Sequence, residues 1–218
     1  MSDIKKLKSE LHEKLEEIIF KDIKKLYPVQ KKSISHINSK DNLIVCAPTA
    51  GGKTLVAELI LVNNILKTGT KAVYIVPLKA LASEKYKYFS EKYPFLNVGV
   101  SSGDYDSNDY YLKEMDIIIV TSEKFDSLLR KKVDWIDNLG VVIVDEIHLM
   151  NEKNRGPTLE IVITHILRED IRIVGLSATI GNPKELSEWL NAKLIYDEWR
   201  PVKLKQGVYK DNKIIFKE

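Results

Sequence analysis

Residues 47–54 read Ala47-Pro48-Thr49-Ala50-Gly51-Gly52-Lys53-Thr54, with an apolar run before them and a helical pattern after them. A strand, a glycine-containing loop, Lys-Thr and a helix in succession are the arrangement that binds nucleotide phosphates. Gly51 and Gly52 let the backbone curl so that its N–H groups point inward, and the start of the helix adds partial positive charge. The stretch therefore predicts a phosphate-binding loop, although the strict motif has glycine where Ala47 stands.

The residues of this loop have distinct expected roles. Lys53 would reach the β- and γ-phosphates, and Thr54 would supply a hydroxyl to Mg²⁺. An ordinary strand-to-helix turn is the alternative for this segment taken alone, because short motifs recur by chance. The residues expected to contact the nucleotide are Thr49, Ala50, Gly51, Gly52, Lys53 and Thr54.

A second motif, Asp145-Glu146-Ile147-His148, ends the buried-strand pattern of residues 139–144. Carboxylates at the carboxyl edge of such a strand lie where ligands bind in open α/β sheets. Asp145 can hold Mg²⁺ directly or through water, and Glu146 can polarise a water for attack on the γ-phosphate. Alone, the motif would be read as a solvated acidic turn. Beside a phosphate loop it predicts a nucleotide hydrolase site with Lys53, Asp145 and Glu146 as catalytic residues.

The composition fits a globular, cytoplasmic protein. The chain has 218 residues, of which 44% are hydrophobic and 30% charged, enough for one good core. No apolar run approaches the roughly 20 residues that span a bilayer, and the first residues lack the apolar core of a signal peptide. The single cysteine, Cys46, excludes internal disulfides. The net charge of +3 is too small to argue for nucleic acid, so any such surface must be a local patch.

Strand and helix patterns alternate along the chain, which predicts a doubly wound α/β fold with a mostly parallel sheet. Residues 3–25 carry one apolar helix face, and Pro28 can start a second short helix. Strands are expected at 42–46, 71–76, 97–101, 116–121, 139–145, 171–176 and 193–196. Helices are expected at 53–67, 79–93, 122–131, 157–167 and 183–190. The strands are continuously apolar, as in a sheet covered on both faces.

We expect the nucleotide-binding domain to span residues 1–198, with residues 1–38 as an N-terminal helical segment. Residues 199–218 contain short extended patterns and no helix to pack beneath them. They predict a segment that leaves the domain.

The order of these motifs resembles that of superfamily 2 helicases, in particular the Ski2-like group and its archaeal Hjm/HelQ type of DNA helicase. The resemblance runs from about Tyr27 to about Val208 and implies the first RecA-like P-loop NTPase domain, with helices on both faces of the sheet. Helicase phosphate loops commonly begin with alanine, which accounts for Ala47. Gly51 stands where many relatives carry serine.

Further motifs follow the same family pattern. Residues 26–30 resemble the adenine motif, in which Gln30 would offer a donor and an acceptor to the base. Asp145–His148 resembles the DExH signature. Ser177-Ala178-Thr179 resembles the motif thought to link hydrolysis to strand movement. The residues implied in this coupling are His148, Ser177 and Thr179.

Three more segments, residues 77–82, 121–125 and 155–160, resemble the loops that face nucleic acid in this family. Each begins at a strand end or a helix start, where unpaired backbone N–H groups can meet phosphates. Singly, each could be an ordinary helix cap. Together they imply nucleic-acid contacts by Lys79, Thr121, Lys124, Arg155 and Thr158.

The resemblance implies the motor domain of an ATP-dependent DNA helicase that uses ATP and Mg²⁺ and moves 3′–5′ on single-stranded DNA. Its partners would be single-stranded or forked DNA, with RNA also open, and a second RecA-like domain that supplies arginines to the γ-phosphate. About forty residues follow Thr179, too few for that domain, so we expect a fragment that does not unwind alone. The alternatives are an RNA helicase domain of the same superfamily and a nucleic-acid-binding module with an inert nucleotide site.

Overall fold

The fold is a parallel sheet covered by helices, as a computed structural model describes it for residues 2–103, 109–169, 171–179, 182–205, 207–210 and 213–216. Within these residues seven strands form one sheet in the order β3-β4-β2-β5-β6-β1-β7, with every pair parallel. Their bounds are β1 Asn42–Cys46, β2 Lys71–Val76, β3 Val98–Ser101, β4 Ile117–Thr121, β5 Leu139–Val144, β6 Arg172–Ser177 and β7 Ala192–Tyr196. Each agrees with its predicted strand within one residue at either end, so the predicted α/β sheet is confirmed.

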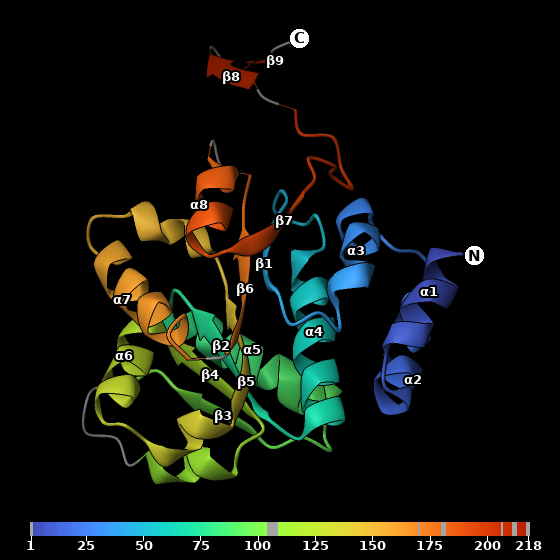
Figure 1. Ribbon diagram of the computed structural model, residues 1–218. Helices are drawn as coiled ribbons and strands as arrows, with labels where there is room; N and C mark the ends of the chain where they lie inside the picture. The colour runs from blue at the N-terminus through green and yellow to red at the C-terminus, as the bar shows by residue number, and fades with distance from the viewer. Residues whose placement is uncertain are drawn as a thin grey trace.

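Helices cover both faces of this sheet (Figure 1). On one face lie α1 (Asp3–Glu10), α2 (Glu13–Asp22), α3 (Pro28–Ser33), α4 (Lys53–Thr68) and α5 (Lys79–Lys92). On the other lie α6 (Ser122–Arg130), α7 (Gly156–Ile166) and α8 (Pro183–Trp189). Short 3₁₀ turns connect them at η1 Ile34–His36, η2 Asp109–Glu114, η3 Asp134–Asn138 and η4 Ile147–Asn151.

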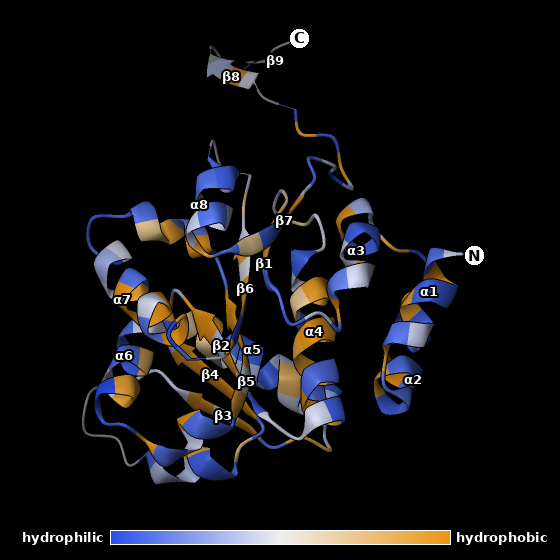
Figure 2. Cartoon of the chain, viewed as in Figure 1, coloured by the Kyte–Doolittle hydropathy of each residue, from blue (hydrophilic) through white to orange (hydrophobic). Residues whose placement is uncertain are grey.

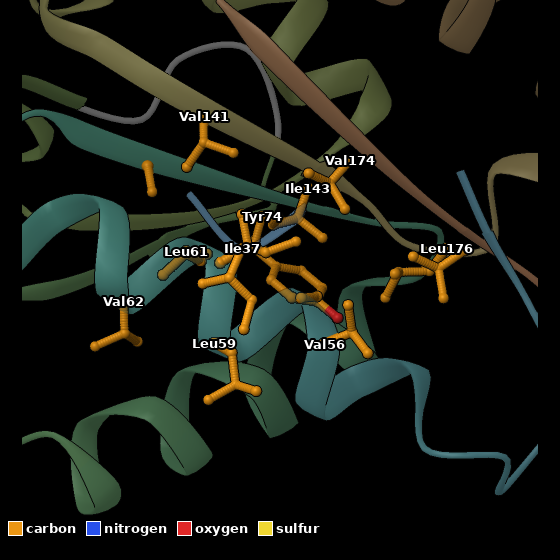
Figure 3. Close-up of a cluster of buried hydrophobic side chains, with 14 of the residues drawn as sticks. Ile37, Val56, Leu59, Leu61, Val62, Tyr74, Val141, Ile143, Val174 and Leu176 are labelled. Atoms are coloured by element: carbon orange, nitrogen blue, oxygen red, sulfur yellow. The ribbon is translucent and has the colours of Figure 1, made fainter. Parts of the chain in front are cut away.

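Successive residues of each strand enter two different cores. Tyr74 and Val76 pack in the cluster beneath α4, whereas Val73 and Ile75 pack in the cluster beneath α6. Figure 3 shows Tyr74 and the β5 side chains meeting apolar side chains of α4. The strands are hydrophobic along their length, and the helices carry hydrophilic residues beside their apolar ones (Figure 2). Alternate side chains of a strand point to opposite faces, and both faces are buried here. The strands are therefore continuously apolar.

The N-terminal apolar pattern is shared by two helices instead of forming one. Leu11 has an extended backbone at φ −95° and ψ 153°, which ends α1. The His12 N–H donates to Asn63 Oδ1 of α4 at 2.7 Å, and His12 Nδ1 accepts from Lys14 N and caps α2. This long-range hydrogen bond explains the break between the two helices. The hydrophobic spacing of residues 3–25 could not predict the break, because Asn63 lies far away in the sequence.

The end of the described chain is extended, as predicted, and forms an antiparallel hairpin of β8 (Gly207–Lys210) and β9 (Lys213–Phe216). Figure 1 shows this hairpin beyond β7, away from the main sheet. None of the helices in the described part of the chain has both the length and the apolar character that crossing a bilayer requires.

Arg172, the first residue of β6, ties the sheet to the N-terminal helical segment. Its guanidinium donates to the carbonyl oxygens of His36, Ile37 and Asp41 at 2.6, 3.0 and 3.0 Å. Burial lowers the pKa of Arg172 to about 10, a value at which the side chain is still charged at neutral pH. One side chain thus satisfies three carbonyls just before β1 begins.

We predict that Arg172→Met lowers the free energy of unfolding by about 3 kcal/mol, because three backbone carbonyls, two of them part-buried, lose a charged donor. Urea denaturation measures this change. Arg168→Met is the matched control, since Arg168 is exposed and its replacement should cost within about 0.5 kcal/mol. Equal losses in the two variants would contradict the role of Arg172.

Candidate functional site

The predicted nucleotide residues meet at one edge of the sheet. β5, β6 and β1 are neighbours, and parallel strands end at the same edge. Residues 47–54, the phosphate loop, follow β1, Asp145 follows β5, and Ser177 is the last residue of β6. The structure thus brings the loop and both family motifs together, as expected for ligands at the carboxyl ends of strands.

The phosphate loop needs both of its glycines. Gly52 has φ 96°, and a Cβ there would lie 2.4 Å from Gln30 Nε2. A Cβ on Gly51 would lie 2.8 Å from the carbonyl oxygen of Pro48. Ala50 also adopts a left-handed backbone at φ 63°, a conformation that costs a non-glycine residue energy. The predicted curl of the loop is therefore confirmed.

Lys53 is folded back onto the loop. Its ammonium donates to the carbonyl oxygens of Ala47 at 2.6 Å and Pro48 at 3.2 Å, and the residue is 8% exposed. Burial lowers the pKa of Lys53, and the carboxylates of Glu146 and Asp145 oppose part of that shift. An ammonium in this position can exchange backbone carbonyls for phosphate oxygens. The neighbouring loop residues Thr49, Ala50 and Thr54 are exposed.

Asp145 is held by two residues that the motif does not reveal. The Tyr74 hydroxyl donates to Asp145 Oδ2 at 3.1 Å, and Lys85 Nζ of α5 lies 4.0 Å from the same oxygen. Burial, followed by the negative charge of Asp145, raises the pKa of Tyr74 well above its ordinary value, so this phenol remains a donor. Lys85 Nζ also lies 5.3 Å from the centre of the Tyr74 ring.

Glu146 lies beside the predicted coupling residues. Its Oε2 is 3.3 Å from His148 Nδ1, which lies 3.5 Å from Ser177 Oγ. The Ser177 carbonyl in turn accepts the Ala47 N–H at 3.1 Å, which connects this group to the phosphate loop. Thr179, the third predicted coupling residue, is exposed just beyond β6.

The site fits a magnesium nucleotide. Glu146 Oε2 is a buried carboxylate oxygen that faces His148 and makes no hydrogen bond within the described residues, which is uncommon away from functional sites. The Glu146 backbone is left-handed at φ 50°, a strained conformation typical of functional positions. The Thr54 hydroxyl and the Asp145 carboxylate are hard oxygen donors of the kind that Mg²⁺ prefers.

Gln30 is engaged in local contacts. Its Oε1 accepts the Tyr27 N–H at 2.8 Å, and its Nε2 donates to the Gly52 carbonyl at 3.3 Å. The amide therefore bridges the start of α3 and the phosphate loop. A second N–H and a second lone pair of Gln30 remain for another partner, so its contact with adenine stays a prediction.

Four of the predicted nucleic-acid residues border one open cavity of about 330 Å³ on the same edge of the sheet. These are Lys79, Thr121, Lys124 and Arg155. The fifth, Thr158, is half-buried in the first turns of α7. Thr121 also caps α6 by accepting the Lys124 N–H at 3.4 Å, so the helix-cap alternative holds beside the predicted role.

Lys124 differs from the other cations of this cavity. Lys79 is exposed and Arg155 half-exposed, but Lys124 is 3% exposed. Its Nζ lies 2.7 Å from Asp109 Oδ2, and both side chains are buried. Sequence alone could not reveal this pair, because Asp109 follows a different strand. The predicted phosphate contact by Lys124 would require the ammonium to leave this carboxylate.

Comparison with protein families decides the relationship. The model of the DEAD/DEAH box helicase family matches residues 27–186, which include the phosphate loop, the acidic motif and the Ser177 motif. The chain belongs to the DEAD/DEAH box helicase family. The three segments of this helicase domain that resemble nucleic-acid-facing loops, residues 77–82, 121–125 and 155–160, also lie within the matched residues.

Sequence comparison with curated relatives shows which helicases the domain is similar to. It is 54% identical over 202 residues to the ATP-dependent DNA helicase Hel308 of Pyrococcus horikoshii, covering 91% of this chain and 28% of that protein. It is 51% identical over 209 residues to the Hel308 helicase of Methanocaldococcus jannaschii, covering 91% and 17%. The helicase domain thus spans less than a third of these relatives, and the predicted resemblance to this archaeal type of helicase is confirmed.

We predict that Lys124→Met lowers the free energy of unfolding of the helicase domain by about 3 kcal/mol, because the buried Asp109 carboxylate loses its ammonium. Chemical denaturation measures the loss. Lys79→Met is the matched control at the exposed rim of the same cavity and should change stability by less than about 0.5 kcal/mol. A Lys124 variant as stable as the control would show that the pair is not structural.

Proposed function

We propose that this domain is the ATP-binding half of a helicase motor that acts on single-stranded DNA. The observation that carries the proposal is the meeting of the Lys53 loop, Asp145, Glu146 and Ser177 at one sheet edge, beside the cavity of Lys79 and Arg155. The names of the relatives, ATP-dependent DNA helicases, favour DNA over RNA.

The mechanism begins with the phosphate loop. Lys53 would exchange the carbonyls of Ala47 and Pro48 for the β- and γ-phosphates, while Gln30 would meet the base. Thr54 and Asp145 would hold Mg²⁺, which supplies positive charge to the phosphates when bound. Tyr74 and Lys85 would keep the Asp145 carboxylate in place for this role.

Glu146, whose side chain is partly exposed, would take a proton from the attacking water. His148 lies between Glu146 and Ser177, and the Ser177 carbonyl bonds to Ala47. A change at the γ-phosphate would therefore reach the end of β6 through adjacent polar contacts. Ser177 and Thr179 would pass that change toward the nucleic acid.

The cavity beside this site would hold the DNA backbone. Lys79, Arg155 and the helix starts of α5 and α6 offer cations and N–H groups, which bind phosphates without reading sequence. We further propose that a second RecA-like domain completes both sites. It would supply the arginines that stabilise charge on the γ-phosphate, a contribution worth about a thousandfold or more in related NTPases.

We predict that the 218-residue chain binds Mg²⁺-ATP and that Lys53→Ala weakens this binding at least about tenfold, because a charge-assisted contact to phosphate is lost. Titration calorimetry measures both affinities. Lys40→Ala is the matched control, since Lys40 is exposed and precedes β1 at the opposite end from the loop. Equal affinity in the wild type and in Lys53→Ala would remove Lys53 from the site.

Turnover requires a second domain, so its test uses a chimera. The aligned residues of the Pyrococcus horikoshii helicase are replaced by the part of this chain that matches them, and ATP hydrolysis and unwinding of forked DNA are measured. We predict that the chimera is active. We also predict that Glu146→Gln in it retains ATP binding and loses about a hundredfold or more of turnover, because the general base is gone.

Wild-type turnover by the Glu146→Gln chimera would mean that another residue positions the water. An inactive wild-type chimera that binds ATP would favour the inert nucleotide-binding module. Competition between single-stranded DNA and RNA of the same sequence then decides the substrate. Preference for RNA would move the proposal to an RNA helicase.

A further inference from the structure

The segment after β7 runs beside the phosphate loop. The Asp197 N–H donates at 3.0 Å to the carbonyl of Cys46, the last residue of β1 and the one that precedes the loop. Residues 197–200 therefore leave the sheet where the nucleotide site begins. The sequence motifs gave no role to this segment beyond an exit from the domain.

Asp197 fastens this segment to α3, the helix that carries Gln30. Its Oδ2 lies 2.8 Å from Lys32 Nζ, and its Oδ1 accepts the Trp199 N–H at 2.8 Å. Lys32 also donates to the Tyr196 carbonyl at 2.9 Å. Burial opposes the charge of Asp197, but the hydrogen bonds from Lys32 and from the Trp199 N–H leave its pKa below the ordinary value. The segment is thus held on both sides of its turn.

The turn places Trp199 against Tyr27. The centres of their rings are 4.7 Å apart, with the ring planes tilted by 51°. Tyr27 in turn lies over the phosphate loop, because a Cβ on Gly52 would be 3.0 Å from Tyr27 Cδ2. The positive charge of the next residue, Arg200, is the smallest of the causes that act on the pKa of Lys53, and it lowers that pKa. Trp199 keeps 40% of its surface exposed, so the indole is available to a further partner.

We propose that Trp199 contacts the purine base of the bound nucleotide and that residues 196–200 form one wall of the nucleotide site. Tyr27, which is hydrogen-bonded to Gln30, and Trp199 of the exit segment together make an aromatic surface. Planar bases stack on such surfaces. The inference rests on the proposed binding of ATP. It adds a base contact from outside residues 27–186, which the family model matches.

Trp199 and Gln30 have different tasks in this arrangement. Stacking tolerates any base because every base has a π-face, whereas an amide distinguishes adenine by its donor and acceptor. Trp199 therefore strengthens the binding of ATP and GTP alike. Because Trp199 belongs to the segment that leaves the domain, this segment would also be in direct contact with the base when a nucleotide is bound.

The test compares ligands with and without a base on the 218-residue chain. Titration calorimetry measures Mg²⁺-ATP, Mg²⁺-GTP and Mg²⁺-tripolyphosphate binding to the wild type, Trp199→Ala and Trp199→Phe. We expect Trp199→Ala to weaken both nucleotides roughly tenfold, the size of one base–aromatic stack, and to leave tripolyphosphate unchanged. Trp199→Phe keeps a ring and should remain within about threefold of the wild type. Trp189→Ala is the matched control, because Trp189 is 41% exposed on α8.

Three results overturn the proposal. Unchanged nucleotide affinity in Trp199→Ala means that the base lies elsewhere, and tighter affinity means that the indole covers the site instead of contacting its ligand. An equal loss for tripolyphosphate means that Trp199 acts on the loop. If the wild type binds tripolyphosphate and ATP but Trp199→Ala binds both normally, only this inference fails. If the wild type binds neither, the proposed function fails with it.

Discussion

Parallel pairing of β6 with β1 on one side and β5 on the other is the constraint on which the site depends. Ser177 is paired with Cys46, and Gly175 with Val144, so the phosphate loop, the acidic motif and the coupling serine begin at nearly the same height. A slip of one residue would turn each side chain to the opposite face. The two apolar cores prevent this slip, because successive strand residues are buried beneath different helices.

That alignment concentrates unfavourable features at the sheet edge. A buried lysine, two adjacent carboxylates and left-handed backbones at Ala50 and Glu146 lie within a few residues of strand ends. Such features reduce stability and are retained where function needs them. A contact at the opposite end of the strands compensates, where Arg172 binds three backbone carbonyls. At Arg172, stability is therefore supplied by a contact that would not touch a ligand at the site.

The sequence predicted the strands and the nucleotide loops well, for a physical reason. Strands buried on both faces are continuously apolar, and the curl at Gly52 requires glycine at a fixed place beside Lys53. Contacts between distant segments could not be predicted in the same way. The pairing of Lys124 with Asp109, the position of Lys85 at Asp145 and the Trp199–Tyr27 contact depend on how separate loops meet. The break at Leu11 likewise depends on Asn63, which lies on another helix.

The fold-back of Lys53 has a consequence for the departure of products. The carbonyls of Ala47 and Pro48 both accept hydrogen bonds from the Lys53 ammonium. The proposed binding of phosphate would therefore exchange one set of oxygens for another, and the net gain would be smaller than the strength of the new contacts suggests. In the proposed motor the same exchange would run in reverse after hydrolysis, because the loop offers the lysine an alternative partner within reach. A loop that competes with its own ligand would hold ADP less tightly and so shorten the time before the next ATP could enter.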